Sequence, residues 1–442
     1  MPLKTSISGV RGTVPDSLTD EVVLNFTKAF GTYLDGGKVV IGRDTRSTGE
    51  HIKEIVIKGL AATGCEIIDI GIAPTPTTQL AVVSQKAKGG IIVTASHNPL
   101  PWNGLKFVKS SGIFLNAEEA EKFFAIYYSQ KFQTAKYQLQ TTNYNQAIND
   151  HINKVLKFVD TEKIKSKKFK VAIDPCNGAG TVITEELLHE LGSEVVAINN
   201  DPNQPFAHPP EPTPANLQDL CALVKNEHCA IGFAQDPDAD RLAIVTEEGE
   251  PMSEEYTITA AAEFLLSLKK PKNAVIVTNL STTQAVDDVA KKYSAQVVRT
   301  KVGEVYVSEK MREIKAFLGG EGNGGLIVPE IGYGRDSLAA IAVMLWYMAE
   351  SNLPLSVLWK SLPQYFIAKH KLEISPEKAA EIIGRVAKNY KNPDLTEGLK
   401  ILLPNGWIHL RPSNTEPIMR IFAEAKTVEA AEQLSKEILN QI

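Results

Sequence analysis

The stretch Val39-Val-Ile-Gly-Arg-Asp44 begins the alternation of segments that decides the fold. Helical periodicity follows over residues 47–64, then the apolar Cys65-Glu-Ile-Ile-Asp-Ile70, a second helical segment over residues 77–86, and the apolar Gly90-Ile-Ile-Val-Thr94. Short apolar runs that alternate with helical periodicity are typical of strands and helices in a layered α/β domain. The sequence therefore predicts an α/β domain at the start of the chain.

The same alternation restarts twice further along. Phe169-Lys-Val-Ala-Ile-Asp174 leads, through a helix that ends at Leu191, to Glu194-Val-Val-Ala-Ile198. Ala274-Val-Ile-Val-Thr278 begins the next restart, which continues with a helix over residues 282–293 and a strand over residues 296–300. Three occurrences of the alternation predict three similar-sized α/β units rather than one large sheet.

The last part of the chain has a different pattern. Its apolar segments and helical segments follow one another without the strand-helix alternation, which favours an antiparallel α+β domain. The predicted strands are residues 366–374, 398–403, 407–410 and 418–425, and the predicted helices are residues 377–390 and 428–441. The predicted domains are residues 1–155, 156–254, 255–355 and 356–442.

Bulk properties exclude several classes of function. A chain of 442 residues exceeds one hydrophobic core and predicts several domains. The net charge of -5 and the pI near 6.0 do not favour nucleic acid or an anionic membrane as a partner. The four cysteines form no CxxC pair, which favours a reducing compartment. The N-terminal residues show no apolar signal core, and no apolar run reaches the roughly 18 residues of a membrane span. We expect a cytoplasmic protein.

Three carboxylates stand at alternate positions in Asp236-Pro-Asp-Ala-Asp-Arg241, directly before the apolar run Leu242-Ala-Ile-Val245. Like charges this close are costly unless a cation neutralises them, and carboxylate oxygens suit Mg²⁺ or Ca²⁺. A calcium-binding EF-hand is disfavoured because Arg241 stands where that loop requires Gly and strand-like residues follow. A solvated acidic turn is the alternative to a metal site.

Ser96 follows the apolar run Ile91-Ile-Val93, at the point where α/β sheets place ligand sites. A serine hydrolase with His97 as its base is disfavoured, because neighbouring side chains in an extended chain point in opposite directions and no Gly-x-Ser-x-Gly elbow is present. A turn that only caps the strand is the alternative to a catalytic role.

Three further motifs carry groups that suit a ligand. Gly320-Glu-Gly-Asn-Gly-Gly325 fits the dinucleotide pattern G-x-G-x-x-G, but Leu326-Ile-Val-Pro329 predicts a strand or loop where that motif needs a helix. Arg411-Pro-Ser-Asn-Thr-Glu-Pro417 offers guanidinium, hydroxyl and backbone donors that suit a phosphate. Ser6-Ile-Ser-Gly-Val-Arg-Gly12 adds Arg11. Glycine-rich or exposed turns are the alternatives for all three.

Taken together and in order, these motifs resemble the α-D-phosphohexomutase superfamily over essentially the whole sequence. The resemblance rests on the five motifs that contain Arg11, Ser96, Asp236, Glu321 and Arg411. It implies four domains around a central cleft. It also implies a cycle in which phosphorylated Ser96 donates to the sugar, a bisphosphorylated sugar turns over, and its other phosphate returns to Ser96.

The resemblance also implies roles for individual residues. Ser96 would carry the phosphoryl group, and Asp236, Asp238 and Asp240 would hold one Mg²⁺ per chain together with an oxygen at Ser96. The residues that would contact the sugar or grip its own phosphate are Glu321, Asn323, Arg411, Ser413, Asn414, Thr415 and Arg420. The other catalytic candidates, around the transfer site, are Arg11, Lys106, Arg241 and His97.

These roles are physically coherent, because phosphoryl transfer is catalysed mainly by positioning and charge neutralisation. Lys106 would serve as a proton shuttle if Arg11 and Arg241 lower its pKa. Gly325 stands where some members carry a His, so a histidine-assisted transfer from that loop is not expected. Pro237 replaces the usual Gly of the metal loop and Asn414 stands where many members have Gly, and neither change removes a predicted ligand.

The substrate predicted from the resemblance is glucosamine phosphate, interconverted between its 6-phosphate and 1-phosphate, with a hexose 1,6-bisphosphate as activator. A phosphoglucomutase/phosphomannomutase is the first alternative, because these sugars differ only at C2. A metal-dependent phosphatase and a non-catalytic sugar-phosphate sensor are further alternatives. The expected partner is a small sugar phosphate, without nucleic acid or membrane, and the chain is expected as a monomer or homodimer.

Overall fold

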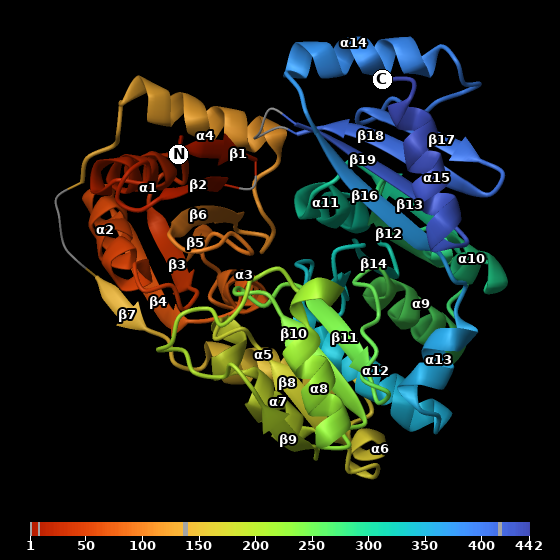
Figure 1. Ribbon diagram of the computed structural model, residues 1–442. Coiled ribbons are helices and arrows are strands. Elements are labelled where there is room, and N and C mark those ends of the chain that lie inside the picture. Colours follow the sequence, from red (N-terminus) through yellow and green to blue (C-terminus); the bar gives the residue numbers. More distant parts are fainter. Residues whose placement is uncertain (1, 8, 136–139, 414–417) are drawn as a thin grey trace. The chain divides into compact units, whose positions relative to one another are not determined.

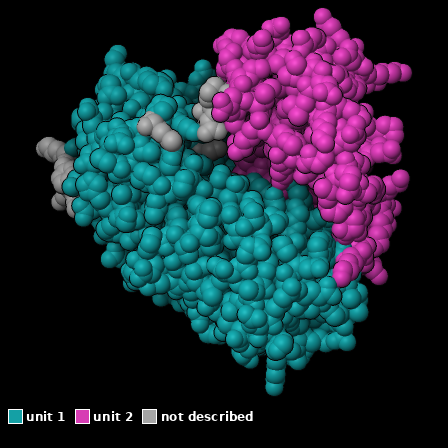
Figure 2. All heavy atoms as spheres, viewed as in Figure 1, with its two compact units in different colours: residues 1–257, 323–359 teal, residues 258–322, 360–442 magenta. Residues whose placement is uncertain are grey.

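The computed structural model describes the chain except for residues 1, 8, 136–139 and 414–417. The chain divides into two compact units, coloured separately in Figure 2. Unit 1 consists of residues 1–257 and 323–359, and unit 2 of residues 258–322 and 360–442. The predicted Asn414 and Thr415 lie outside the described residues.

Unit 1 contains a seven-stranded mixed sheet in the order β1-β2-β6-β5-β3-β4-β7 (Figure 1). Its β3, β4, β5 and β7 run parallel, while β1, β2 and β6 pair antiparallel along one edge. The strands are β1 Lys4–Ser6, β2 Gly9–Thr13, β3 Gly37–Arg43, β4 Cys65–Ile72, β5 Gly89–Val93, β6 Trp102–Lys109 and β7 Thr141–Asn143. β3, β4 and β5 match the predicted strands to within three residues.

Helices cover both faces of this sheet. One face is covered by α1 Asp20–Tyr33, α2 Gly49–Ala62 and α4 Ala117–Ser129, which share one apolar core with the strands. Within that core Phe26 and Phe30 pack on Phe107 and Phe123, with ring centroids 4.5–6.5 Å apart. α3 Thr75–Ser84 packs on β3 and β5, and α5 Ala147–Phe158 packs on α3.

A second, four-stranded mixed sheet of unit 1 has the order β11-β10-β8-β9. Its strands are β8 Lys170–Asp174, β9 Glu194–Ala197, β10 Ile231–Gln235 and β11 Leu242–Thr246. Only the β10–β11 pair is antiparallel. A tight loop joins these two strands, and this loop carries the three aspartates. The accompanying helices are α6 Thr161–Lys165, η1 Ala179–Val182, α7 Thr184–Glu190, η2 Pro214–Asn216 and α8 Gln218–Asn226.

The rest of unit 1 begins with β15 Gly325–Ile327, so a strand, one of the two predicted states, follows the glycine-rich motif where a dinucleotide site would need a helix. α12 Ser337–Ser351 is apolar and buried on nearly all sides, and its N-terminus is capped by the Asp336 carboxylate. α13 Leu355–Ser361 follows. Among the described residues no single helix is long and apolar enough to cross a membrane, and α12 with α13 passes that test only as a pair bent by 92°.

Unit 2 contains a parallel sheet and an antiparallel sheet. In the parallel sheet β12 Val275–Asn279 lies between β13 Gln296–Thr300 and β14 Leu318–Glu321. The accompanying helices are α9 Tyr256–Lys269, which begins at the boundary with unit 1, α10 Ala285–Lys292 and α11 Glu304–Ile314.

The C-terminal sheet is antiparallel throughout, in the order β16-β19-β18-β17. Its strands are β16 Phe366–Glu373, β17 Leu399–Leu403, β18 Gly406–Pro412 and β19 Ile418–Ala425. α14 Pro376–Ala387 and α15 Val428–Leu439 bury their apolar residues against it, and both begin at hydroxyl caps, Ser375 and Thr427. The predicted fold class, three α/β sheets followed by an antiparallel α+β domain, is confirmed. The four domain ranges stay predictions.

Candidate active site

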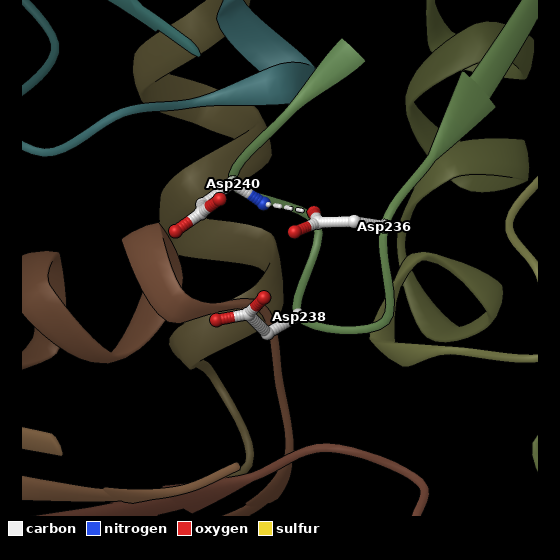
Figure 3. Close-up of side chains that lie close together, drawn as sticks. All are labelled: Asp236, Asp238 and Asp240. Carbon is white, nitrogen blue, oxygen red and sulfur yellow. Dashed lines mark hydrogen bonds between the residues drawn. The ribbon is translucent and has the colours of Figure 1, made fainter. Parts of the chain in front are cut away.

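The three aspartates of the β10–β11 loop form one buried cluster. Asp236, Asp238 and Asp240 are fully buried, and each offers a carboxylate oxygen within 4.8 Å of the others (Figure 3). One carboxylate oxygen of Asp238 and one of Asp240, both Oδ1, are buried without a hydrogen-bond partner among the described residues. Buried carboxylate oxygens without partners are costly, and a divalent cation would satisfy them. The alternative of a solvated acidic turn is therefore wrong.

The loop backbone is held in a conformation that turns the carboxylates together. Ala239 has φ 51°, a left-handed conformation that costs a residue with a Cβ roughly 1–2 kcal/mol. The Ser337 hydroxyl donates to the Ala239 carbonyl at 2.6 Å, and the backbone N–H groups of Asp240 and Arg241 donate to Asp236 Oδ1 at 3.1 and 3.2 Å. Strain of this kind persists only where the surroundings enforce it, as they do at functional loops.

Cations contact the cluster from separate elements. The Lys106 ammonium on β6 lies 2.5 Å from Asp238 Oδ2 and 3.3 Å from Asp240 Oδ2. Arg335 Nη2 donates to Asp240 Oδ2 at 2.6 Å, and Arg241 Nε lies 3.8 Å from Asp236 Oδ2. The carboxylates are thus partly neutralised by the protein itself, and two oxygens remain for a metal ion.

The electrostatics of the cluster divide its carboxyl groups. Burial, together with the charges of Asp240 and Asp238, raises the pKa of Asp236 well above its usual value. Burial also opposes ionisation of Asp238 and Asp240, but Lys106 and Arg335 outweigh it and lower the pKa of both. A carboxyl group whose ionisation is opposed by burial and by two neighbouring carboxylates is one that a further positive charge would stabilise.

The Lys106 pKa is raised, so the lowered pKa on which its role as a proton shuttle depended is not found. Burial and Arg11 do lower it, but Asp238 and Asp240 are in direct contact with the ammonium and raise the pKa above its ordinary value. The motif spacing did not reveal this contact, because Lys106 and the aspartates lie on different sheets. Lys106 is therefore held as a cation.

The Ser96 hydroxyl lies next to this cluster. Ser96 follows β5 with φ 51°, and its Oγ donates to Asp236 Oδ2 at 3.3 Å. The Thr94 hydroxyl accepts the Ser96 N–H at 2.9 Å and donates to Asp44 at 2.6 Å, which fixes the turn. The fold therefore places this hydroxyl beside Asp236 of the aspartate cluster, 140 residues further along the chain.

A buried arginine holds the backbone on both sides of Ser96. Arg46 Nη2 donates to the carbonyls of Ser96 and Asn98 at 2.6 and 2.7 Å, and its Nη1 donates to the Trp102 carbonyl at 2.8 Å. Asp44 neutralises the same guanidinium at 3.0 Å. The planar fork of an arginine suits several acceptors at once, so Arg46 gives the loop one shape.

His97 and Arg11 complete the surroundings of Ser96. The expectation that His97 points away from Ser96 is wrong, because His97 Nδ1 lies 3.4 Å from Ser96 Oγ. The physical reason is the left-handed backbone at Ser96, which ends the alternation of an extended chain. Burial and the nearby arginines lower the His97 pKa well below its usual value, and Arg11 Nη1 donates to Asn98 Oδ1 at 3.0 Å.

Gly325 leaves space for Arg335. A Cβ added at Gly325 would lie 2.2 Å from Arg335 Cδ, so a larger residue would displace the arginine that contacts Asp240. From the sequence, Gly325 implied only that no histidine of this loop assists proton transfer. The structure adds that the glycine admits a permanent cation, which sequence spacing alone did not predict.

The predicted sugar contacts fall in different units. Glu321, at the end of β14 in unit 2, is buried, and its Oε1 accepts from Asn279 Nδ2 at 2.8 Å and from the Gly303 N–H at 2.9 Å. Asn323 belongs to unit 1, where its Oδ1 accepts the Gly325 N–H at 3.2 Å.

The predicted phosphate clamp lies in the C-terminal sheet. Arg411 on β18 stands directly opposite Arg420 on β19, which in turn stands opposite Lys371 on β16. Directly paired residues in an antiparallel sheet present their side chains on the same face, so three cations form one row. Arg411 Nε is buried without a hydrogen-bond partner among the described residues, while the Ser413 N–H donates to the Ile418 carbonyl. Such a row favours an anionic ligand.

Comparison with known proteins assigns the family. Residues 3–134, 149–249, 253–366 and 371–441 match, in order, the α/β/α domains I, II and III and the C-terminal domain of phosphoglucomutase/phosphomannomutase. The chain is 38% identical to a phosphoglucomutase/phosphomannomutase of Thermococcus kodakarensis, over 96% of this chain and 95% of that protein. The chain belongs to the phosphoglucomutase/phosphomannomutase family.

Other relatives of this phosphohexomutase agree. A phosphoglucosamine/phosphogalactosamine mutase of Sulfurisphaera tokodaii is 36% identical, over 97% of both chains. The crystal structure of a family protein from Burkholderia thailandensis superposes with a TM-score of 0.86 at 26% identity, covering 100% of this chain and 97% of that one. The predicted superfamily resemblance and the isomerase activity, that of a phosphohexomutase, are thereby confirmed.

Within the phosphohexomutase, unit 1 brings together one set of predicted residues. Ser96, His97, Lys106, Arg11, Arg241 and the three aspartates surround one another there, while Glu321, Arg411, Ser413 and Arg420 belong to unit 2. Sequence reasoning missed Asp44, Arg46, Thr75 and Arg335. The Thr75 hydroxyl donates to Asp238 Oδ2 at 2.6 Å. Asp44 and Arg46 belong to a polar run at the end of a predicted strand, Gly42-Arg-Asp-Thr-Arg-Ser47, which could have pointed to them, whereas no motif contains Thr75 or Arg335.

Proposed function

We propose that this phosphohexomutase interconverts glucosamine 6-phosphate and glucosamine 1-phosphate. The proposal is supported by relatives named for that activity, including a probable phosphoglucosamine mutase of Methanopyrus kandleri that is 33% identical over 98% of this chain. A carboxylate at the sugar-binding loop also suits an ammonium group at C2, and Glu321 supplies one. Asn323 is the second proposed contact to the sugar.

Ser96 is proposed as the residue that carries the phosphoryl group. The observation that supports this role is the position of Ser96 Oγ, 3.3 Å from Asp236 in a carboxylate cluster that needs a further cation. Phosphorylated Ser96 is proposed to donate its phosphoryl group to the free oxygen of the sugar phosphate, which gives a hexose 1,6-bisphosphate and leaves a free Ser96 hydroxyl. That hydroxyl then takes the other phosphate of the bisphosphate, so the 1,6-bisphosphate is both the intermediate and the activator. A turn fixed by Arg46 and Thr94 keeps the oxygen in one place through both transfers.

One Mg²⁺ per chain is the proposed cofactor. Asp236, Asp238 and Asp240 would hold it with an oxygen at Ser96, and the all-oxygen donor set with two buried oxygens lacking partners fits a hard divalent ion. When bound, the ion supplies neutralising charge to the phosphoryl oxygens. Lys106, Arg11 and Arg241 are proposed to add fixed positive charge around the same position, and His97 is the proposed hydrogen-bond partner of the hydroxyl.

The phosphate that does not react is proposed to bind at the C-terminal sheet. Arg411 and Arg420 face the same side of the sheet, and Ser413 directly follows β18. Asn414 and Thr415, which lie outside the described residues, are the other two proposed phosphate contacts. Binding energy from a remote phosphate can be used to orient the reacting end of the sugar. One clamp then serves both orientations of the substrate.

A phosphoglucomutase/phosphomannomutase is the second candidate, favoured by the 38% identical relative of Thermococcus kodakarensis with that name. Purified protein assayed with the 1-phosphates of glucosamine, glucose and mannose, each with Mg²⁺ and glucose 1,6-bisphosphate, separates the two. We expect the highest kcat/KM for glucosamine 1-phosphate. A glucosamine value well below the other two would overturn the preference.

Ser96→Ala tests the reaction itself, with Ser84→Ala as the matched control because Ser84 is an exposed helical serine outside the cluster. We expect loss of mutase activity by about three orders of magnitude or more in the first variant and none in the second. Release of inorganic phosphate in place of sugar-phosphate isomer would indicate a phosphatase. Biological activity that survives in Ser96→Ala would indicate a sugar-phosphate sensor.

A further inference from the structure

Two carboxylates of unit 2 bind adjacent backbone amides. Glu397 Oε2 accepts the Val302 N–H at 2.6 Å, and Glu321 Oε1 accepts the Gly303 N–H at 2.9 Å. Glu397 comes from the segment before β17, while Glu321 ends β14, so the chain distance between them is large. Residues 302–303 therefore connect two acidic side chains that no sequence motif relates.

The amide pair sits in a rigid turn. Residues 302–303 join β13 to α11, and Gly303 has φ 132°, a conformation that L side chains rarely adopt. A turn that only glycine can make leaves the two N–H groups with a fixed relative direction. The two carboxylates are therefore held in a fixed geometry by one short piece of backbone.

Both carboxylates are connected to the proposed substrate contacts. Glu397 pairs with one of them, and Glu321 is one itself. Arg411 Nη1 lies 3.3 Å from Glu397 Oε1, and both side chains are at most one-sixth exposed. Glu321 is itself the proposed contact to the sugar. The path from the phosphate-binding guanidinium to the sugar-binding carboxylate thus runs through Glu397, Val302 and Gly303.

A second path closes the ring. His409 Nε2 lies 2.8 Å from the Glu397 carbonyl, and His409 Nδ1 lies 2.9 Å from Ser281 Oγ. The Ser281 N–H donates to Asn279 Oδ1 at 2.8 Å, and Asn279 Nδ2 donates to Glu321 Oε1. A neutral imidazole has one donor and one acceptor, so the carbonyl assigns the hydrogen to Nε2 and Nδ1 accepts from the serine.

We propose that Glu397 is a positioning residue that fixes the separation between the phosphate-binding Arg411 and the sugar-binding Glu321, so that the enzyme binds a sugar phosphate more tightly than a phosphate without its sugar. The inference rests on the proposed function for the roles of those two residues. Glu397 holds the guanidinium from one side, while the buried Arg411 Nε keeps a donor for a ligand. A lone phosphate can be met by a reoriented arginine, whereas a sugar phosphate needs both ends in register.

Binding to the Ser96→Ala protein tests this without turnover. Calorimetry would give Kd for glucosamine 6-phosphate, glucose 6-phosphate and inorganic phosphate in three derivatives of that protein: Glu397→Gln, Glu397→Asp and Glu432→Gln. Glu397→Asp keeps the charge but is one methylene shorter. Glu432, on α15, is the matched control because its carboxylate pairs with His370 at 3.1 Å and takes no part in the ring.

We expect both Glu397 variants to weaken sugar-phosphate binding about tenfold, the equivalent of about 1.4 kcal/mol, and to change inorganic phosphate binding less than about threefold. Glu432→Gln should change neither. In a double-mutant cycle, Glu397→Gln should add little to Arg411→Ala, because the residue to be positioned is absent.

The failures are distinguishable. Equal binding of the sugar phosphates by Glu397→Gln and its parent, or weakening that adds fully to that of Arg411→Ala, would overturn the positioning role alone. A parent protein that binds neither sugar phosphate would overturn the proposed function together with the inference that rests on it.

Discussion

The aspartate loop of unit 1 and the cationic row of unit 2 are built in different ways. Asp236, Asp238 and Asp240 come from one short loop, are fully buried and are contacted by side chains from several elements. Arg411 and Arg420 lie on neighbouring strands, and the support of Arg411 comes from Glu397 in a separate segment. A catalytic centre needs fixed charges in a dry environment, whereas a binding face needs donors that a substrate can still reach. A site such as the aspartate loop can be predicted from one local motif, whereas a site such as the cationic row can be predicted only in part.

The largest expected effect concerns the aspartate loop. Asp238→Asn removes one negative charge and leaves the Lys106 ammonium facing an amide. We expect kcat to fall by about three orders of magnitude, and Mg²⁺ binding measured by calorimetry to weaken with it. Treatment of the unaltered enzyme with EDTA should abolish activity in the same way, and Mg²⁺ should restore it. Full activity after complete removal of divalent ions would contradict the metal assignment.

The next largest effect concerns Arg46, which holds the backbone around Ser96 but does not itself contact the aspartate cluster. Arg46→Lys keeps a positive charge but cannot reach the carbonyls of Ser96, Asn98 and Trp102 together. Because Asp44 is buried with it, we expect a loss of stability of about 3 kcal/mol, and kcat lower by about two orders of magnitude. Thermal unfolding and steady-state kinetics measure both. A variant with unchanged kcat would mean that the turn at Ser96 holds its shape without the guanidinium.

The cationic row should respond differently. Arg411→Lys keeps the charge and loses the fork that contacts Glu397 and, in our proposal, the phosphate. We expect KM to rise about tenfold or more with kcat changed far less, because remote binding is removed rather than transition-state contact. Steady-state kinetics with the preferred sugar phosphate decide this. An equal fall in kcat with unchanged KM would erase the distinction between the two sites.

The same substitution, glycine to alanine, is expected to act differently at Gly325 beside the aspartate cluster and at Gly384 in α14. Gly325→Ala places a methyl group 2.2 Å from Arg335 Cδ, so we expect the arginine to leave Asp240 and kcat to fall about tenfold. Gly384→Ala in α14 meets nothing within 4 Å and should raise stability by about 0.5–1 kcal/mol without a change in kinetics. The same measurements on both proteins show whether the first effect is local to the cluster.

The smallest expected effect is a pH dependence in the unit 2 ring. Burial lowers the pKa of His409 to about 4, below the value near 6.5 expected for an unfolded chain. Stability from the neutral imidazole is therefore complete above about pH 6.5 and is lost as pH falls toward 4. Histidine NMR should find His409 neutral at pH 5, and the stability difference between the unaltered protein and His409→Gln should shrink as the pH falls over this window. A His409 resonance that titrates near 6.5 would contradict the buried ring.

Much of the fold could be predicted, because the strands that build each sheet are short apolar runs flanked by helical periodicity. Predicted β3, β4, β5, β12 and β13 differ from the structure by at most three residues. Ser96 could be named because it follows such a strand, and the three aspartates because they stand at alternate positions directly before one. Arg46, Arg335 and Glu397 could not, since their roles come from contacts with residues distant in sequence. The Lys106 pKa was predicted wrongly because it depends on carboxylates from another sheet. The direction of His97 was predicted wrongly for a local reason, the left-handed backbone at Ser96.

The central claim is that the Ser96 hydroxyl, beside the aspartate cluster, carries the transferred phosphate. Intact-protein and peptide mass spectrometry after incubation with glucose 1,6-bisphosphate and Mg²⁺ tests it most directly. We predict one phosphate per chain, located on Ser96, which disappears when glucosamine 6-phosphate is added and the bisphosphorylated sugar forms. A fully active enzyme with no phosphate on Ser96, or with phosphate on another residue, would contradict the account.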